Sequence, residues 1–261
     1  MKTALITGAS SGIGAEFAHQ LATKKIDLVL VARSQDKLNQ LAEQLRQQHG
    51  IRAEVISQDL TEPSAAAAVA RQVEELGITI DLLINNAGFG DYGSFAESQL
   101  QRQTSMIQLN ISALVELTHA FLPAMLNRHQ GGIINVSSIA GFQPMPYWSV
   151  YAASKAFVLS FSEALWAEVK EKGVKVLALC PGPTESNFFK VAEVPSDSDM
   201  SSNLNQLDSV ENVVTSALNA LASGESNTVT GGLMTQVIAN LPRVLPRDVL
   251  VDLVEKQFRN T

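Results

Sequence analysis

The sequence predicts an α/β fold: a doubly wound parallel sheet of about seven strands with helices on both faces. Short apolar runs alternate with longer helical stretches, and several of the runs are almost continuously hydrophobic. Such alternation is typical of a parallel sheet with right-handed crossovers, and continuous hydrophobicity is typical of strands covered on both faces. The chain has 261 residues, of which 46% are hydrophobic. We therefore expect one large domain that spans residues 1–261.

Each expected element rests on its own pattern. The expected strands are short runs rich in Val, Ile and Leu, at 3–7, 27–32, 53–57, 80–84, 132–137 and 175–180. The expected helices lie between them, near 13–24, 36–48, 63–76, 97–128 and 149–171. The segment 181–207 is rich in Pro, Ser and Asp, and we expect a substrate loop or lid there.

Composition favours a soluble protein. The net charge of −7 disfavours nucleic acid as a partner. No run reaches the ~20 apolar residues of a membrane helix, so no integral membrane segment is expected. The apolar start of the chain stops at Thr7, which is too short for a secretion signal. The single cysteine, Cys180, cannot form an internal disulfide, and no Cys/His cluster has metal-ligand spacing. We expect a cytoplasmic protein without a metal.

A glycine turn, "TGASSGIG" at 7–14, follows the first expected strand and opens a helix. Glycines here permit a tight turn, and the helix N-terminus offers free N–H groups to a pyrophosphate. The same letters contain G-x-S-x-G, the pattern of a hydrolase nucleophile centred on Ser10. A hydrolase also needs a later histidine, and none of the four histidines lies in the C-terminal half of the chain. A dinucleotide site is favoured over a hydrolase.

The second expected strand ends in "VLVARSQDKL", which bears on cofactor choice. A fold selective for NAD places Asp or Glu near this position to bind the ribose hydroxyls. Here Arg33 occupies it, and Lys37 follows one helical turn later. A guanidinium suits the 2′-phosphate of NADP, although a solvated arginine after a strand is the plainer alternative. The sequence favours NADP(H).

Several separated motifs carry a family resemblance. "TGASSGIG", "NNAG" at 85–88, Asn110, Ser138 and "YAASK" at 151–155 occur in this order, and Ser138 precedes Tyr151 by 13 residues. Over about residues 2–190 the chain resembles the short-chain dehydrogenases/reductases, which have a Rossmann-type fold. The resemblance implies that Tyr151 is the general acid/base and that Lys155 lowers its pKa and holds the nicotinamide ribose. It further implies that Ser138 binds the substrate oxygen and that Asn110 anchors a proton-relaying water.

The same resemblance implies where the cofactor lies. "CPGPTESNF" at 180–188 resembles the family segment that borders the nicotinamide, with Ser186 where threonine is usual. Asp59 and Leu60 resemble the adenine contact. The residues expected to bind NADP(H) are Gly8, Ser10, Ser11, Gly12, Ile13, Gly14, Arg33, Lys37, Asp59, Leu60, Asn86, Ala87, Gly88, Tyr151, Lys155, Pro181, Gly182 and Thr184.

Tyr151 and Lys155 share one face of the expected helix, with Cβ atoms roughly 5–6 Å apart. Bringing a phenol of pKa near 10 to neutral operation needs about 3 units, or ~4 kcal/mol. An ammonium at ~5.5 Å supplies on the order of 3 kcal/mol at an effective dielectric near 20. We therefore expect Lys155 to lower the pKa of Tyr151. Taken alone, this spacing also fits an ordinary surface pair.

The expected substrate contacts are apolar. They come from "GFGDY" at 88–92, "GFQPMPYW" at 141–148 and the start of the irregular loop: Phe89, Tyr92, Phe142, Met145, Trp148 and Phe188. Aromatic and methionine side chains favour a hydrophobic ketone, aldehyde or 3-oxoacyl group, although ordinary packing is an equal alternative. No arginine or lysine clusters in these segments, so no partner for an anionic substrate group is expected.

Two questions stay open at this level. The run 233–261 has apolar residues at helical spacing, which fits a cover for the core, a subunit interface of a homodimer or homotetramer, or weak contact with a membrane surface. Proteins of this fold also serve as NADP(H)-binding sensors or scaffolds without catalysis. Such proteins usually lose the tyrosine or the lysine, and this chain keeps both. A reductase acting on a small-molecule carbonyl or alcohol is therefore favoured.

Overall fold

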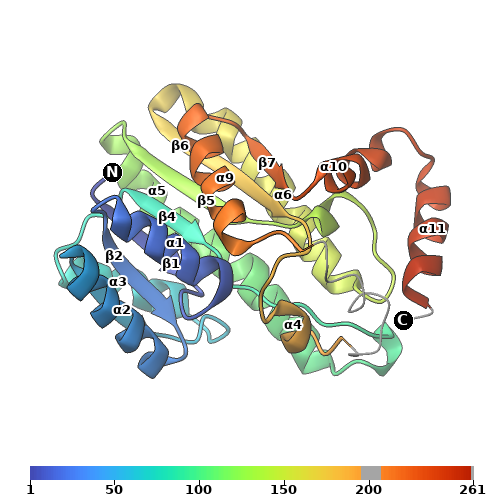
Figure 1. Cartoon of the computed structure of the whole chain (residues 1–261), viewed down its shortest axis with the longest axis horizontal. Coiled ribbons are helices and arrows are strands. Elements are labelled where there is room, and N and C mark those ends of the chain that lie inside the picture. Colours follow the sequence, from blue (N-terminus) through green and yellow to red (C-terminus); the bar gives the residue numbers. More distant parts are fainter. Residues whose placement is uncertain (195–206, 260–261) are drawn as a thin grey trace.

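The computed structural model describes residues 1–194 and 207–259, which form a seven-stranded parallel sheet flanked by helices (Figure 1). The strands are β1 (Thr3–Thr7), β2 (Asp27–Ala32), β3 (Ala53–Ser57), β4 (Leu82–Asn85), β5 (Gly131–Val136), β6 (Val174–Pro181) and β7 (Asn227–Thr230). The helices are α1 (Gly12–Thr23), α2 (Gln35–His49), α3 (Ala65–Glu75), α4 (Leu100–Ile107), α5 (Leu114–Asn127), α6 (Ser149–Val169), α7 (Phe188–Val191), α9 (Val210–Ser223), α10 (Leu233–Asn240) and α11 (Arg247–Arg259). The predicted fold class is confirmed.

Two layers of helices cover the two faces of the sheet. One buried cluster joins the sheet to α1, α2 and α9, with Phe17, Leu38 and Leu218 among its members. A second cluster joins the other face to α3, α5 and α6, and includes Leu117 and Leu165. Because both faces are covered, the strands can be as continuously apolar as the sequence has them.

The strand order, β3-β2-β1-β4-β5-β6-β7, fixes where a ligand can bind. From β1 the chain builds outward to β2 and β3, and then returns to place β4 on the other side of β1. In open parallel sheets, ligands bind at such a switch point, where the loops after the two adjacent strands, here β1 and β4, diverge at the carboxyl ends. The predicted cofactor residues follow these carboxyl ends, so the topology brings them to one edge.

The predicted helix 97–128 is not regular. The chain makes a 3₁₀ turn at Phe95–Glu97, forms α4, continues through a π-helical segment at Gln108–Ala113 and only then becomes α5. Asn110 lies inside the π-helical segment. Such insertions are rare and occur frequently at functional sites.

The stretch Leu100–Asn127 is long and apolar enough to cross a membrane by length and composition alone, with a mean hydropathy of 1.4 over an 18-residue window. The sequence analysis did not expect such a segment. Leu114, Leu117 and Met125 of this stretch are buried in the core of the domain. Packing in the core explains part of this apolar character, since 33% of the most apolar 18-residue window is buried, and one such helix is weak evidence for a membrane span.

The C-terminal third adds elements that the sequence analysis did not specify. β7 reads "NTVT" and has no apolar run, and α9 begins after Ser209, whose side chain accepts a hydrogen bond from the backbone N–H of Asn212 at 3.1 Å. The predicted irregular segment contains the short helix α7, and its part 195–206 lies outside the described residues. α10 and α11 occupy the 233–261 run and extend away from the sheet (Figure 1).

Candidate active site

The glycine turn after β1 is shaped by close backbone contacts. Gly8 has φ +65°, and a Cβ there would lie 2.8 Å from the side-chain nitrogen of Asn86. A Cβ on Gly14 would lie 2.3 Å from the carbonyl oxygen of Gly8. Thr7 ties this turn to the loop after β4, because its hydroxyl oxygen accepts hydrogen bonds from the N–H groups of Asn86 and Ala87 at 3.0 and 2.9 Å. Only glycine fits at these two positions without displacing the turn.

The N-terminus of α1 faces the crevice from this turn. Within the described residues the Ser11 side chain makes no capping bond, so the first N–H groups of α1 are available to an anion. A Cβ on Gly12 would lie 3.5 Å from Cβ of Ser186, in the segment after β6. The predicted pyrophosphate cradle and the predicted nicotinamide segment therefore approach each other across the crevice.

The residues expected at the adenosine end are mostly exposed. The guanidinium of Arg33 lies 3.7 Å from the carboxylate of Asp59, and the Arg33 side chain is 74% exposed. Burial acts to raise the pKa of Asp59, but hydrogen bonds from Thr61 and the charge of Arg33 together lower it. Lys37 is exposed on α2, while Leu60 is buried in the core. Arg33 and Lys37 thus present two cations beyond the end of β2.

The predicted catalytic lysine and tyrosine are both buried on α6. The ammonium of Lys155 lies 5.8 Å from the centre of the Tyr151 ring and donates to the backbone carbonyl of Val136 at 2.8 Å. Ser138, which follows β5, lies close enough to Tyr151 for its hydroxyl to act to lower the pKa of that phenol. Gly88 lies beside this group, since a Cβ there would be 3.4 Å from the Lys155 nitrogen. The structure therefore brings Ser138, Tyr151 and Lys155 together as predicted.

The electrostatics differ from the expectation. Burial raises the pKa of Tyr151 to about 12, although the hydrogen bond with Ser138 acts in the opposite direction. Burial also lowers the pKa of Lys155 to about 8. Desolvation of the buried phenolate dominates the pKa of Tyr151, while the ammonium of Lys155 is directed at the Val136 carbonyl. That Lys155 lowers the pKa of Tyr151 stays a prediction for the cofactor-bound protein.

Asn110 is a structural clamp between two parts of the site. Its side-chain oxygen accepts from the N–H of Phe89 at 3.1 Å, and its nitrogen donates to the Phe89 carbonyl and to the Ser154 hydroxyl, both at 3.0 Å. The Ser154 hydroxyl in turn donates to the Tyr151 carbonyl at 2.7 Å. Asn110 thus joins the loop after β4 to the first turn of α6, and its predicted water-anchoring role stays a prediction.

Tyr92, Trp148, Tyr151 and Phe188 form what we call the aromatic cluster. The ring centres of Tyr151 and Phe188 are 5.2 Å apart, and Trp148 stacks on Phe188 at 6.0 Å. Tyr92 packs on Trp148 at 5.5 Å. Of the six predicted substrate contacts, five belong to one buried group around Tyr151: Phe89, Tyr92, Met145, Trp148 and Phe188. Phe142 packs elsewhere, with Leu159 and Cys180 on the other side of α6.

Several residues of the site were not singled out from the sequence. A Cβ on Gly90 would lie 2.8 Å from Phe188 and 2.9 Å from Trp148, so this glycine allows the rings to close on Tyr151. Tyr147 has φ +66°, a strained value for a tyrosine, beside the aromatic cluster. The signal for Gly90 was its place between aromatic residues in "GFGDY"; nothing marked Tyr147.

Two other chemistries find little support. Cys180 is buried at the end of β6, where burial raises the pKa of its thiol to about 12, so it is a poor nucleophile. In the part of the chain that the structure describes, no group of three His, Cys, Asp or Glu side chains could hold a metal ion.

A glycine turn at the switch point of a parallel sheet, together with a Ser-Tyr-Lys group of which Tyr151 and Lys155 are buried, is an arrangement typical of an oxidoreductase that binds a nicotinamide dinucleotide. The model of the short chain dehydrogenase family matches residues 2–195. The chain therefore belongs to the short-chain dehydrogenase/reductase family, as the motifs predicted, and the hydrolase alternative at Ser10 is excluded.

Similar proteins are enzymes of this family. The ketoacyl reductase HetN of Nostoc is 38% identical over 181 residues, which are 69% of this chain and 63% of that protein. A short-chain dehydrogenase from Sphingobium yanoikuyae in complex with NADPH has a TM-score of 0.81 and 37% identity over 88% of this chain and 87% of that one. The bulky-bulky ketone specific alcohol dehydrogenase from Comamonas testosteroni has a TM-score of 0.77 and 31% identity over 95% and 96%. These comparisons give no support to the non-catalytic alternative.

Proposed function

We propose that the protein is an NADP(H)-dependent reductase of hydrophobic ketones, aldehydes or 3-oxoacyl groups, with Tyr151 as the general acid/base. The observation that carries the proposal is the packing of the aromatic cluster on Tyr151: Phe188 and Trp148 lie 5.2 and 5.6 Å from its ring. A carbonyl that reaches the Tyr151 hydroxyl must lie against these rings, which favours apolar substituents. The ketoacyl and bulky-ketone activities in the names of two similar proteins support the same class.

The chain's own residues fit NADP(H). Gly8 and Gly14 allow the tight turn that presents the N-terminus of α1 to a pyrophosphate, and Arg33 with Lys37 suits a 2′-phosphate. When bound, the cofactor supplies the hydride that reaches the carbonyl carbon. The protein holds that cofactor and delivers the proton.

At neutral pH the proton is already in place. A pKa of about 12 keeps Tyr151 protonated, so it can donate to the carbonyl oxygen as that oxygen becomes an alkoxide. Ser138 binds the same oxygen, and Lys155, whose pKa is about 8, is mostly charged and stabilises the phenolate that remains. For an alcohol substrate the same groups work in reverse.

The proposal is tested by following NADPH absorbance with benzil, decanal, a steroid ketone and an acetoacetyl thioester, and with pyruvate as the small charged control. Tyr151→Phe should lower turnover about 10³-fold, because it removes the proton donor, and should change the Kd of NADPH by less than about threefold. Surviving turnover in Tyr151→Phe would refute the mechanism. A preference for pyruvate would refute the substrate class.

A homodimer or homotetramer and a cytoplasmic location remain predictions. On α10, Leu233, Met234 and Val237 are 80%, 67% and 51% exposed, which is more apolar surface than an isolated subunit needs. Light scattering with and without lipid vesicles separates self-association from contact with a membrane surface.

A further inference from the structure

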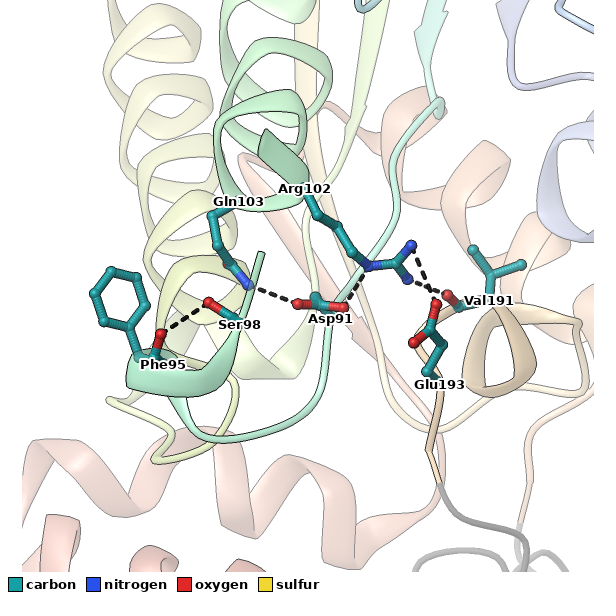
Figure 2. Close-up of polar contacts among 7 residues, drawn as sticks. All are labelled: Asp91, Phe95, Ser98, Arg102, Gln103, Val191 and Glu193. Atoms are coloured by element: carbon teal, nitrogen blue, oxygen red, sulfur yellow. Dashed lines mark hydrogen bonds and ion pairs between the residues drawn. The ribbon is translucent and has the colours of Figure 1, made fainter. Parts of the chain in front are cut away.

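Arg102 lies at the centre of a group of polar contacts that joins α4 to the substrate side of the crevice (Figure 2). Its guanidinium forms an ion pair with the carboxylate of Asp91, in the loop after β4. It also donates to the backbone carbonyl of Val191 at 2.6 Å and lies 3.4 Å from the carboxylate of Glu193. The sequence analysis expected no basic residue near the substrate contacts, yet the guanidinium carbon lies 5.5 Å from the centre of the Phe89 ring.

The contacts of Arg102 hold two segments at once. Asp91 is anchored separately by the side chain of Gln103, which donates to it at 2.6 Å, so the Arg102–Asp91 pair is fixed with respect to α4. On the other side, Val191 ends α7, and Glu193 follows it with φ +60°, in the left-handed region that costs a non-glycine residue energy. The N–H of Tyr92 also donates to the Ala192 carbonyl at 3.1 Å. The segment that follows α7 is therefore held against the loop after β4, with Glu193 in a strained conformation.

The position of α7 decides where Phe188 lies. Phe188 is the first residue of α7, and its ring packs on Tyr151 and Trp148. Asp91 and Glu193 neutralise the charge of Arg102, which leaves it unsuited to binding an anionic substrate. Its fork of donors suits a different task, which is to bond a carboxylate and a backbone carbonyl at the same time.

We propose that Arg102 is a positioning residue for substrate selection: by bridging Asp91 and the end of α7 it holds Phe188 as the wall of the pocket next to Tyr151. Arg102 touches neither the reacting atoms nor the predicted cofactor residues. The role of Arg102 in substrate selection rests on the proposed function, whereas its role in holding α7 and Phe188 in place does not. Loss of the bridge frees α7, so a bulky apolar carbonyl loses an aromatic wall while a small one loses little.

The chain offers a matched control in Arg128. It too bonds a backbone carbonyl, that of Ile80 at 2.9 Å, and an aspartate, Asp81 at 3.7 Å, with a side chain 35% exposed against 28% for Arg102. Arg128 lies at the amino ends of the strands, away from Tyr151. Arg128→Met therefore removes similar contacts without touching the pocket.

The kinetic test compares Arg102→Met, Arg102→Lys and Arg128→Met with benzil and propanal. Arg102→Met should raise the KM for benzil about tenfold. The KM for propanal, and the kcat for both substrates, should change by less than about threefold. Arg102→Lys should raise the benzil KM nearly as much, because one ammonium replaces the fork, while its melting temperature falls less. An unchanged or lower benzil KM in Arg102→Met, or an equal rise in Arg128→Met, would overturn the proposal.

A second readout does not depend on catalysis. In a Trp166→Phe background, Trp148 is the remaining tryptophan and is 3% exposed. Arg102→Met should shift its fluorescence emission to longer wavelength as Phe188 leaves the indole, and Arg128→Met should not. Equal emission in the two variants would refute the bridge even if no carbonyl were turned over. If the wild-type protein turned over no carbonyl while Arg102→Met still showed this shift in emission, the proposed function would be refuted and the bridge would not.

Discussion

The glycine turn and the aromatic cluster are held by different kinds of contact. The glycine turn is fixed by short-range geometry at the ends of two adjacent strands: Thr7 bonds the N–H groups of Asn86 and Ala87, and Gly14 meets the carbonyl of Gly8. The aromatic cluster and the residues packed around it come from the loop after β4, the start of α6, α7 and α11, which are far apart in the sequence. The sheet determines the position of the glycine turn, whereas the position of the aromatic cluster depends on loops and on α11.

The two sides of the site therefore differ in the substitutions that they tolerate. A single added carbon obstructs the glycine turn, so the cofactor side tolerates almost no variation. The substrate side is held by side chains such as Arg102 and by the packing of rings, which other residues can replace with a different shape. Cofactor binding and substrate selection can therefore be perturbed independently.

The largest effect is expected on the cofactor side, from Gly14→Ala. The new Cβ would lie 2.3 Å from the Gly8 carbonyl oxygen, so the turn must move. We expect the Kd of NADPH, measured by fluorescence titration, to rise about 100-fold, which corresponds to the ~3 kcal/mol that overpacking costs. Turnover of every carbonyl should fall with it.

Gly50→Ala is the control for this change. Gly50 has φ +63° at the end of α2, and no described atom lies within 4 Å of a Cβ there. It should destabilise the fold by about 1 kcal/mol, which lowers the melting temperature by about 3 °C, and leave the Kd of NADPH unchanged. Weakened binding in both variants would mean that general destabilisation, not the turn, explains the loss.

A smaller and more selective effect is expected from Arg33→Gln. It removes a charged donor from the 2′-phosphate, and we expect the Kd of NADPH to rise about 30-fold, the equivalent of ~2 kcal/mol for a bond to a charged group. The Kd of NADH and the KM for benzil should stay within about twofold. Similar affinities of the wild-type protein for NADH and NADPH would contradict the assigned role of Arg33.

The smallest effect is expected from a change in pH, which titrates Lys155. Reduction needs the charged form of Lys155, so kcat/KM should fall above pH 8 by up to about tenfold per unit. Because burial lowers the pKa of Lys155 from 10.5 to about 8, the unfolded chain binds more protons between these values. The contribution of Lys155 to stability therefore rises with pH in this window. A parallel melting series should show that the protein stays folded over this range, so that the loss of rate reflects loss of the Lys155 charge and not unfolding. A rate that stays flat to pH 10 would contradict the role of Lys155.

The sequence predicts the cofactor side well because each of its parts follows a strand. β1, β2 and β3 have the predicted bounds, and the glycine turn, Arg33 and "NNAG" come directly after apolar runs. Parallel strands bring their carboxyl ends to one edge, so position along the chain gives position in space. The clustering of Ser138, Tyr151 and Lys155 follows from the same logic and from the periodicity of α6.

Tertiary contacts decide the parts that local patterns do not predict. The residues of β7 around Val229 are polar, so no apolar pattern indicates this strand. Its pairing with β6 specifies it. The π-helical segment around Asn110 has no local sequence signal, and in the structure Asn110 is bonded to Phe89, 21 residues away in the sequence. Nothing in the sequence distinguishes Arg102 from other helix residues, and its role follows from its contact with Val191 of α7. The raised pKa of Tyr151 results from burial, which the spacing between Tyr151 and Lys155 does not reveal.

The end of the chain also contributes to the pocket. Leu250, Val254 and Phe258 of α11 share one buried cluster with Tyr151, and the hydroxyl of Tyr92 donates to the Phe258 carbonyl at 3.0 Å. The family match ends at residue 195, well before α11. Two proteins alike over the matched region can therefore diverge in what they accept while keeping the same chemistry. Exchange of the 13 residues of α11 between such relatives is a short evolutionary route to a new substrate, and sequence identity counted over the family region alone is a poor guide to it.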